Sequence, residues 1–270
     1  MKKLLFAALV IVMVSSLAGT SSAFGTGGVK KKRPLPYNYG LVIINNYSEK
    51  AWIAPVVFDH WLHRAFHTCR VCHVDIGFAM KAGDTNIRAD DNINGYYCGA
   101  CHNGKMKVGD KVLFASCSKT PLREDNSRCE KCHSYGKNVK MEFDFYKFTD
   151  PLPKEGFGNG VDWDKAEEMG LIKPVSYVEG ISAKPQNLVI QKDFTIQASV
   201  EGLPGIIFSH KKHTVWSGCE LCHPEIFMVK KGASKYSMPE IFDGKFCGVC
   251  HGFVAFPLTN CQRCHTQPVQ

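Results

Sequence analysis

The sequence places Phe208-Ser-His210-Lys-Lys-His213 just upstream of Cys219-Glu-Leu-Cys222-His223. The same arrangement occurs earlier, where Phe58-Asp-His60-Trp-Leu-His63 precedes Cys69-Arg-Val-Cys72-His73. In both copies the second histidine stands six residues before the first cysteine, and a further Cys-x-x-Cys-His follows 29 or 28 residues on. This self-similarity indicates a tandem repeat of one structural unit.

Cys-x-x-Cys-His occurs six times in the chain. Two thiols three positions apart can add to the two vinyl groups of one haem, and the histidine that follows can coordinate its iron. Zinc ribbons do not require a histidine after each cysteine pair, and redox dithiols normally occur as one copy on a thioredoxin-like scaffold. We therefore predict six covalently attached haem c groups, each with its iron. The attaching cysteines are Cys69, Cys72, Cys98, Cys101, Cys129, Cys132, Cys219, Cys222, Cys247, Cys250, Cys261 and Cys264, and the proximal histidines are His73, His102, His133, His223, His251 and His265.

The first 23 residues have the features of a secretory signal peptide. Lys2 and Lys3 precede a short apolar run over residues 4–14, and Ser21-Ser-Ala23 is a small-residue cleavage site. The run is too short to anchor a mature protein in a bilayer. We expect an exported protein without a membrane span after signal removal. Its expected location is the periplasm, with the outer membrane and the cell exterior as alternatives.

The 270-residue chain is 44% hydrophobic and has a formal net charge of +8. The hydrophobic content excludes a disordered chain and a membrane bundle. Six haems would add about twelve propionates, and the surplus of basic residues compensates their charge. The basic charge therefore does not indicate nucleic-acid binding.

Five of the eleven histidines lie outside the motifs, and each stands upstream of a repeat's first motif. Four of them occupy equivalent positions in the two repeats: His60, His63, His210 and His213. This placement predicts that these four are distal haem ligands, two in each repeat. One haem in each repeat then remains without an assigned distal ligand.

Methionine is the candidate for that position in the second repeat, where Met238 stands nine residues before Cys247. Methionine ligation would raise the reduction potential of that haem above its bis-histidine neighbours. In the first repeat, alignment on glycine puts Ala89 where the second has Met238. The candidates there are Met80, His67 and, with less support, Met106. Met80 is slightly favoured, although it aligns with Val229, which cannot ligate iron.

The repeat also sets the expected domain organisation. We predict a signal peptide at 1–23, an amino-terminal extension at 24–50, triheme domains at 51–140 and 203–270, and a connector at 141–202. Within the connector, residues 141–149 and 188–198 have strand-like patterns and residues 164–170 a helical one. About 41 residues per haem are too few for a large conventional core. We expect a mostly irregular fold with short α-helices around the haems, and a small, partly β connector that acts as a spacer.

Phe-x-His-x-x-His followed by three Cys-x-x-Cys-His motifs resembles the triheme cytochromes of the c7 type, which are relatives of the c3 type. The resemblance covers about half of the chain and is closest at 208–213, 238–244, 247–251 and 255–256. It implies closely packed haems and electron transfer in the periplasm or outside the cell of anaerobic bacteria. For multidomain members it implies two bis-histidine haems and one histidine–methionine haem per domain. The first domain departs from this pattern at the methionine.

These features favour an electron carrier rather than an enzyme. Its partners would be other redox proteins of anaerobic respiration, such as cytochromes, a membrane quinol-oxidising complex or a terminal reductase, and its electrons could pass toward extracellular metal. A multiheme reductase of nitrite, hydroxylamine or a sulfur oxyanion is the alternative, and it would need one open haem. A subunit of a cytochrome filament or outer-membrane conduit is a third class. Cys117 lies outside every motif, and we expect a buried thiol there.

Overall fold

The structure is a computed structural model that describes residues 35–117, 127–184, 189 and 192–267. The predicted signal peptide lies outside the described residues. So do the first part of the amino-terminal extension and part of the strand-like segment 188–198. Within the described ranges, no helix is long and apolar enough to cross a membrane.

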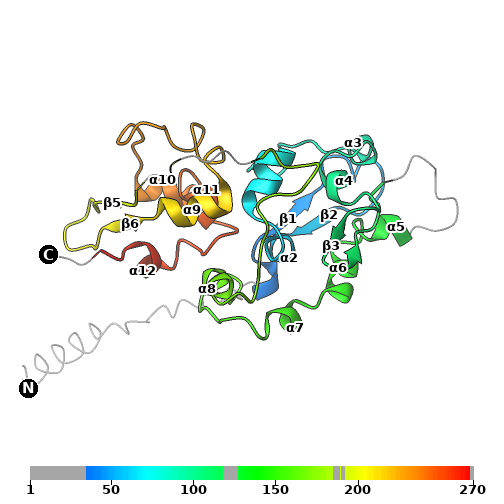
Figure 1. Cartoon of the computed structure of the whole chain (residues 1–270), viewed down its shortest axis with the longest axis horizontal. Helices are drawn as coiled ribbons and strands as arrows, with labels where there is room; N and C mark the ends of the chain where they lie inside the picture. The colour runs from blue at the N-terminus through cyan, green and yellow to red at the C-terminus, as the bar shows by residue number, and fades with distance from the viewer. Residues whose placement is uncertain (1–34, 118–126, 185–188, 190–191, 268–270) are drawn as a thin grey trace, which may run out of the picture. The chain divides into compact units, whose positions relative to one another are not determined.

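Each repeat opens with a two-stranded antiparallel hairpin that leads directly into a helix (Figure 1). In the first repeat, β1 (Leu41–Ile44) pairs with β2 (Val56–Asp59), and α2 (His60–Arg64) follows. In the second, β5 (Phe194–Ile196) pairs with β6 (Ile206–Phe208), and α9 (His210–Ser217) follows. Branched and aromatic side chains favour the strands. The histidine pairs therefore lie on helices whose entry is fixed by a hairpin.

The rest of each repeat consists of short helices joined by irregular chain. After the short 3-10 helix η1 (Pro36–Asn38) and the first hairpin, the first repeat has the π-helix η2 (Val71–Ile76), α3 (Ala89–Ile93), α4 (Cys98–Cys101), α5 (Ser127–Glu130) and α6 (Lys137–Glu142). The second has α10 (Met238–Phe242), α11 (Gly248–His251) and α12 (Cys261–Cys264). Short helices with a few short strands match the coarse fold expectation.

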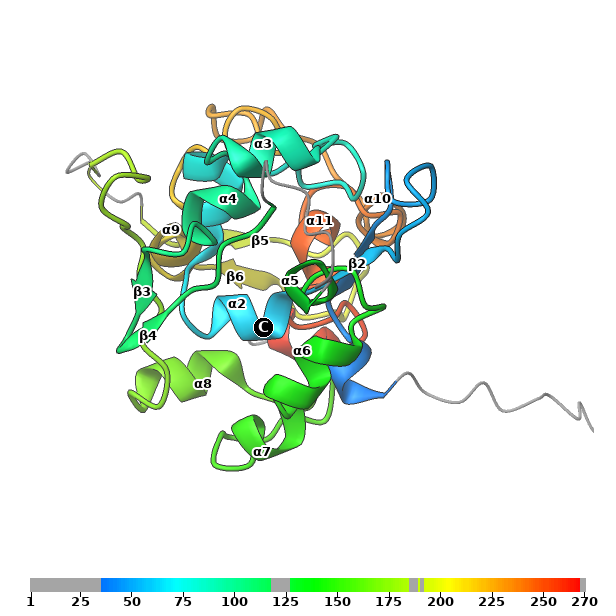
Figure 2. The ribbon, with the colours of Figure 1, turned by 90° about the vertical axis from the view of Figure 1, so that its right-hand side faces the viewer.

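The first repeat also contains a small hairpin that the second repeat lacks in the described residues. Strands β3 (Lys107–Val108) and β4 (Lys111–Val112) pair antiparallel (Figure 2). At the end of the hairpin away from its turn, Asn103 forms an isolated bridge with Ala115. This hairpin accounts for part of the longer spacing between the second and third motifs of the first repeat.

The connector contains helices where we predicted one strand. Residues 141–149 form the end of α6 and the whole of α7 (Phe145–Thr149), so the strand prediction for this segment is wrong. Asp144 is the reason, because its carboxylate accepts hydrogen bonds from the N–H groups of Tyr146 and Lys147 and so caps a helix. The predicted helix is present as α8 (Trp163–Glu168), but it begins one residue earlier than predicted, after the cap Asp162. The second strand-like segment contains β5.

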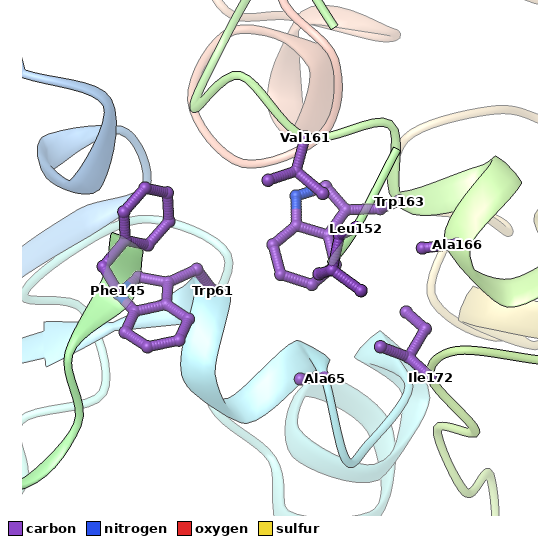
Figure 3. Packing of buried hydrophobic residues seen from close by; sticks show 8 residues of the cluster. All are labelled: Trp61, Ala65, Phe145, Leu152, Val161, Trp163, Ala166 and Ile172. Atoms are coloured by element: carbon purple, nitrogen blue, oxygen red, sulfur yellow. The ribbon is translucent and has the colours of Figure 1, made fainter. Parts of the chain in front are cut away.

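The main cluster of buried hydrophobic residues lies between α2 and the connector (Figure 3). Its members are Trp61, Ala65, Phe145, Leu152, Val161, Trp163, Ala166 and Ile172. Burying a large apolar side chain contributes about 1.5–3 kcal/mol. The connector therefore holds the helix that presents His60 and His63.

Candidate haem sites

Three pairs of histidine rings face each other at nearly the same distance. The centroids are 6.5 Å apart for His60 and His73, and 6.4 Å for His63 and His102. In the second repeat, His213 and His251 are 6.2 Å apart. Two imidazoles that bind one metal from opposite sides, with bonds of about 2 Å, place their ring centres about 6 Å apart. The three spacings fit one haem iron between the two rings of each pair.

The pairing follows the order of the chain. The first histidine of α2 faces the proximal histidine of the first motif, and the second faces that of the second motif. By the repeat, His213 faces the proximal histidine of the fifth motif. The equivalent pair of His210 and His223 has no ring contact among the described residues. Its assignment rests on the repeat.

Nine of the eleven histidines share one contact, in which Nδ1–H donates to a backbone carbonyl at 2.7–3.1 Å. This bond leaves the Nε2 lone pair free, and metal-ligating histidines usually have such a partner. The nine are His60, His63, His73, His133, His210, His213, His223, His251 and His265. These imidazoles are held in one tautomer and one orientation.

The accepting carbonyls occupy equivalent places in the two hairpins. His60 donates to Gly40 O at 2.7 Å, and His210 donates to Lys192 O at 3.1 Å. The strand registers place these two carbonyls at the same position, two residues before the paired residues Val42 and Phe194. Each hairpin therefore orients the first distal histidine of its repeat.

The third proximal histidines are also held by the hairpins. His133 donates to Ala54 O, and His265 to Pro204 O, both at 2.7 Å. Ala54 and Pro204 each stand two residues before the second strand of their hairpin. The upstream strands β1 and β5 are thus part of the structural repeat and contribute to the sites.

A phenylalanine lies against the second proximal histidine of each repeat. The ring of Phe256 is 4.2 Å from that of His251, which donates to the Phe256 carbonyl at 3.0 Å. In the first repeat, Phe114 lies 4.4 Å from His102. The His102 Nδ1 is buried without a hydrogen bond of good geometry. Burial lowers the pKa of His102, and the nearby Phe114 carbonyl offsets only part of this effect. Phe114 comes after the extra hairpin, so more residues separate it from His102 than separate Phe256 from His251.

Burial keeps five of the predicted ligand imidazoles neutral. It lowers the pKa of His60, His63 and His251 to about 4, and the carbonyl bonds offset only part of this effect. Burial also lowers the pKa of His73 and His102. A neutral imidazole is the form that binds iron. The sites are therefore ready for ligation at neutral pH.

The helices α3 and α10 are structural equivalents. Each has a capping box at its start, and each lies against a glycine of the following motif, Gly99 or Gly248. In both cases a Cβ on the glycine would overlap a backbone carbonyl of the preceding helix. Met238 and Ala89 are the first residues of these helices. The structure therefore supports the alignment of Ala89 with Met238.

The structure does not single out one distal ligand for His133. Met80 follows η2, and its counterpart Val229 is 76% exposed. His67 forms a bridge with Val175 of the connector, and its Nδ1 is buried without a partner. Met106 lies in the extra hairpin, where its N–H donates to Asn103 Oδ1 at 2.9 Å. Among the described ring contacts, none joins His67 to His133, so the ligand stays a prediction.

All thirteen cysteines lie in the described residues, and no two of them form a disulfide. Cys117 is half-buried, and burial raises the pKa of its thiol. A tetrahedral zinc site needs at least three ligands at one point. The described residues bring no such group of His, Cys, Asp or Glu together.

The connector contacts both repeats. Arg64 of α2 lies over the ring of Trp163 in the connector, at 4.9 Å, and over that of Trp216 in α9, at 5.2 Å. It also donates to Val254 O at 3.2 Å. Arg263 of the sixth motif pairs with three connector carboxylates, Glu155 and Asp162 at 2.8 Å and Asp164 at 3.3 Å. The predicted spacer is therefore a packed element between the repeats.

A family model described as cytochrome c7 and related cytochrome c matches residues 56–136 and 206–266, which together exceed half of the chain. The chain belongs to this family. The two matched ranges fall on the two repeats, so this multiheme c-type cytochrome has two c7-like regions. The family binds haem c and serves electron transfer, and the histidine pairs described above fit that cofactor.

Solved structures with similarity to this cytochrome are also multiheme proteins. A "c7-type three-heme cytochrome domain" is 32% identical, over 30% of this chain and 99% of that chain, with a TM-score of 0.27. The C-terminal hexaheme fragment of GSU1996 is 25% identical, over 84% and 98%, with a TM-score of 0.25. The dodecaheme cytochrome c GSU1996 is 21% identical, over 84% and 74%, with a TM-score of 0.25. No curated protein matches the chain.

Proposed function

We propose that this cytochrome is an exported hexaheme electron carrier of anaerobic respiration. The observation that carries the proposal is the spacing of three histidine pairs at 6.2–6.5 Å, because an iron bound on both sides has no position left for a substrate. Each bound haem would supply a one-electron iron centre. We further propose the periplasm or cell exterior as its location, and redox proteins or extracellular metal as its partners.

The chain's own residues hold the ligands in a fixed geometry. Carbonyl bonds orient the imidazoles and burial keeps them neutral. Preorganised ligands need little rearrangement when the iron changes oxidation state. Arg64 and Arg263 contact the connector, and these contacts hold the two repeats together.

The contacts between repeats suggest where electrons cross. Arg70 lies inside the first motif, and a Cβ on Gly218, next to Cys219 of the fourth motif, would be 2.9 Å from its Cδ. These two motifs therefore abut. We propose that electrons pass between the repeats at the first and fourth motifs, although the third and fourth are neighbours along the chain.

Low-temperature EPR of the oxidised, haem-loaded protein tests the carrier function. We expect low-spin signals to account for the iron of every bis-ligated haem, with six haems per chain by mass spectrometry. The paired rings of His60 and His73 are nearly parallel, at 7°, whereas the other two pairs are at 64° and 61°, so more than one class of low-spin signal is expected. High-spin signals from the paired haems would contradict the proposal.

A reductase with one open haem is the second candidate, and Ala89 is the observation that favours it. Ala89 has no donor atom, yet it begins α3 as Met238 begins α10. If methionine completes the third site of the second repeat, the same site in the first repeat lacks that ligand. Its iron would then accept a small ligand such as nitrite or hydroxylamine.

Carbon monoxide binding to the reduced protein decides between the two. The open-haem hypothesis predicts one equivalent for the wild type, none for Ala89→Met and two for Met238→Ala. Asp90→Met is the matched control, because it adds a methionine at the next, exposed position of α3 and should leave one equivalent. A wild-type protein that binds no carbon monoxide would exclude the reductase and leave the carrier.

A further inference from the structure

Tyr39 belongs to the segment before β1, but its hydroxyl reaches the second repeat. It donates a hydrogen bond to Ala255 O at 2.6 Å. Burial raises the pKa of Tyr39 to about 12, so the hydroxyl stays protonated and remains a donor. The next carbonyl along the chain, Phe256 O, accepts the Nδ1–H of His251 at 3.0 Å. Only the two backbone dihedrals of Phe256 separate these carbonyls, so fixing the first restricts the second.

Arg64 of α2 holds the carbonyl before these two. Its guanidinium donates to Val254 O at 3.2 Å and lies over the rings of Trp163 and Trp216, at 4.9 and 5.2 Å. A planar guanidinium that stacks on aromatic rings loses little further freedom when it donates a hydrogen bond. Two consecutive carbonyls of the second repeat are therefore held by donors that lie outside that repeat.

The connector fixes the ring that carries the Tyr39 hydroxyl. Gly158 has a φ of +61° and approaches both sides of this contact. A Cβ on Gly158 would lie 3.5 Å from Cε1 of Tyr39 and 3.3 Å from Cδ of Pro257. The tyrosine ring and the loop that it holds are thus packed against the same turn of the connector.

The held loop is also tied to the fifth motif. The N–H groups of Val254 and Ala255 both donate to Cys250 O at 3.0 Å, and Leu258 N–H donates to His251 O at 3.1 Å. The loop therefore transmits the contacts of the first repeat to the backbone and to the imidazole of the predicted proximal ligand.

The first repeat supports the equivalent phenylalanine by itself. Ser116 N–H donates to the carbonyl of the second proximal histidine, as Leu258 N–H does in the second repeat, so Phe114 and Phe256 are equivalent. The residues just before Phe114 lie in the extra hairpin, where β4 pairs with β3. Among the described residues the second repeat has no such hairpin. There the donors of the first repeat provide the support instead.

We propose that Tyr39 and Arg64 are positioning residues for the proximal imidazole of the fifth motif. By holding the two preceding carbonyls, they keep Phe256 O in line with the Nδ1–H of His251. A hydrogen bond at Nδ1 raises the basicity of a ligating imidazole, and a more basic ligand favours ferric iron. The proposal rests on His251 as a haem ligand of the proposed carrier. It adds that the first repeat sets the reduction potential of a haem in the second.

A spectroelectrochemical titration of Tyr39→Phe tests this role, because the variant removes one oxygen atom and keeps the packed ring. We expect the haem of the fifth motif to become easier to reduce. At a fixed potential its ferric-to-ferrous ratio should fall about threefold, which is part of the worth of one hydrogen bond. The fifth-motif component is the one that His213→Met displaces, since the rings of His213 and His251 face each other.

A second measurement follows the hydrogen bond itself. In the reduced protein with isotope-labelled histidine, nuclear magnetic resonance reports how fast each ring N–H exchanges with solvent. We expect the Nδ1–H of His251 to exchange faster in Tyr39→Phe than in the wild type, because Phe256 O is then less firmly held. Exchange at His60 should not change, because its acceptor, Gly40 O, is held by the first hairpin.

Tyr37→Phe is the matched control. It removes a hydroxyl two residues earlier, and within the described ranges this hydroxyl forms no hydrogen bond, although the ring packs against Tyr146 at 6.3 Å. The titration and the exchange should both stay as in the wild type. Arg64→Lys keeps the charge but loses the planar fork and the stacking, so it should shift the fifth-motif component in the same direction as Tyr39→Phe.

The outcomes separate the positioning role from the carrier function. If Tyr39→Phe leaves both the fifth-motif component and the exchange at His251 unchanged, the positioning role is overturned and the carrier function remains. An equal shift of the components of both repeats would also overturn it, because the variant would then have loosened the whole protein. If His213→Met displaces no component, the proposed ligation is wrong and the positioning role fails with it.

Discussion

Replacing His213 with methionine is expected to raise the reduction potential of one haem by on the order of 100 mV. The ring of His213 faces that of His251 at 6.2 Å, so on the proposed pairing the change removes the distal imidazole from the fifth motif's iron. Thioether sulfur stabilises ferrous iron relative to imidazole, and an iron left without the ligand also becomes easier to reduce. A spectroelectrochemical titration of the variant should show one component displaced to higher potential.

Lys211→Met is the matched control for this prediction. It places a methionine on the same helix, α9, at an exposed position between the two histidines, and the titration should stay as in the wild type. His63→Met should reproduce the shift in the first repeat, because its ring faces His102 at nearly the same distance and angle. If His213→Met leaves all potentials unchanged, His213 is not an axial ligand and the ring pairing has another origin.

The sequence alone predicts which histidines ligate haem, because the chemistry of each site depends on its side chains. Cys-x-x-Cys-His identifies a haem and its proximal ligand, and the repeat isolates His60 and His63 from other histidines. The partner assignment, first with first and second with second, required the structure. It depends on how α2 meets the hairpin, and no spacing rule specifies that.

The carbonyl anchors could not be predicted in the same way. Gly40, Lys192, Ala54 and Pro204 act through a group that every residue has, so their identities carry no signal. Only the phenylalanine that lies against the second proximal histidine of each repeat leaves a recognisable pattern in the sequence. A phenylalanine stands five residues after His251, and the corresponding Phe114 lies against His102 beyond the extra hairpin.

The connector shows where pattern reading failed. Alternating apolar residues in 141–149 suggested a strand. In the structure, Phe145 and Leu152 belong to the buried cluster around Trp61. The helix cap at Asp144 determines the local structure. A helix cap depends on a single side chain, so the alternation of apolar residues over nine positions outweighed it in the prediction. The spacer prediction overlooked the packing of the connector, because the sequence does not show which residues the apolar side chains of the connector contact.

Gly248→Ala is expected to destabilise the second repeat by about 3 kcal/mol or more. The added Cβ would overlap the carbonyl oxygen of Ile241, which belongs to the backbone of α10 and cannot rotate away. Relief requires α10 and α11 to separate, and Ile241 is itself buried. Thermal unfolding of the haem-loaded variant should begin at a lower temperature, and mass spectrometry should show chains with fewer than six haems.

Gly156→Ala is the control, because its Cβ would meet nothing within 4 Å and its φ lies outside the left-handed region. It should unfold as the wild type does. Gly99→Ala should repeat the effect in the first repeat, where the overlap is with the carbonyl of Asn92. Equal stability of Gly248→Ala and the wild type would mean that the two helices are not packed as described.

The reason for this glycine is packing rather than haem attachment. The same position of the motif is Arg70, Glu130, Glu220 and Gln262 in the first, third, fourth and sixth copies. Only the second and fifth copies have glycine there, and only these follow α3 and α10. The helix that begins with Met238 or Ala89 is therefore held against its motif at a distance that excludes any side chain. A substitution there should disturb the position of Met238 as well as the fold, so its effect on the haem that Met238 is predicted to ligate should exceed its effect on the haems of the other repeat.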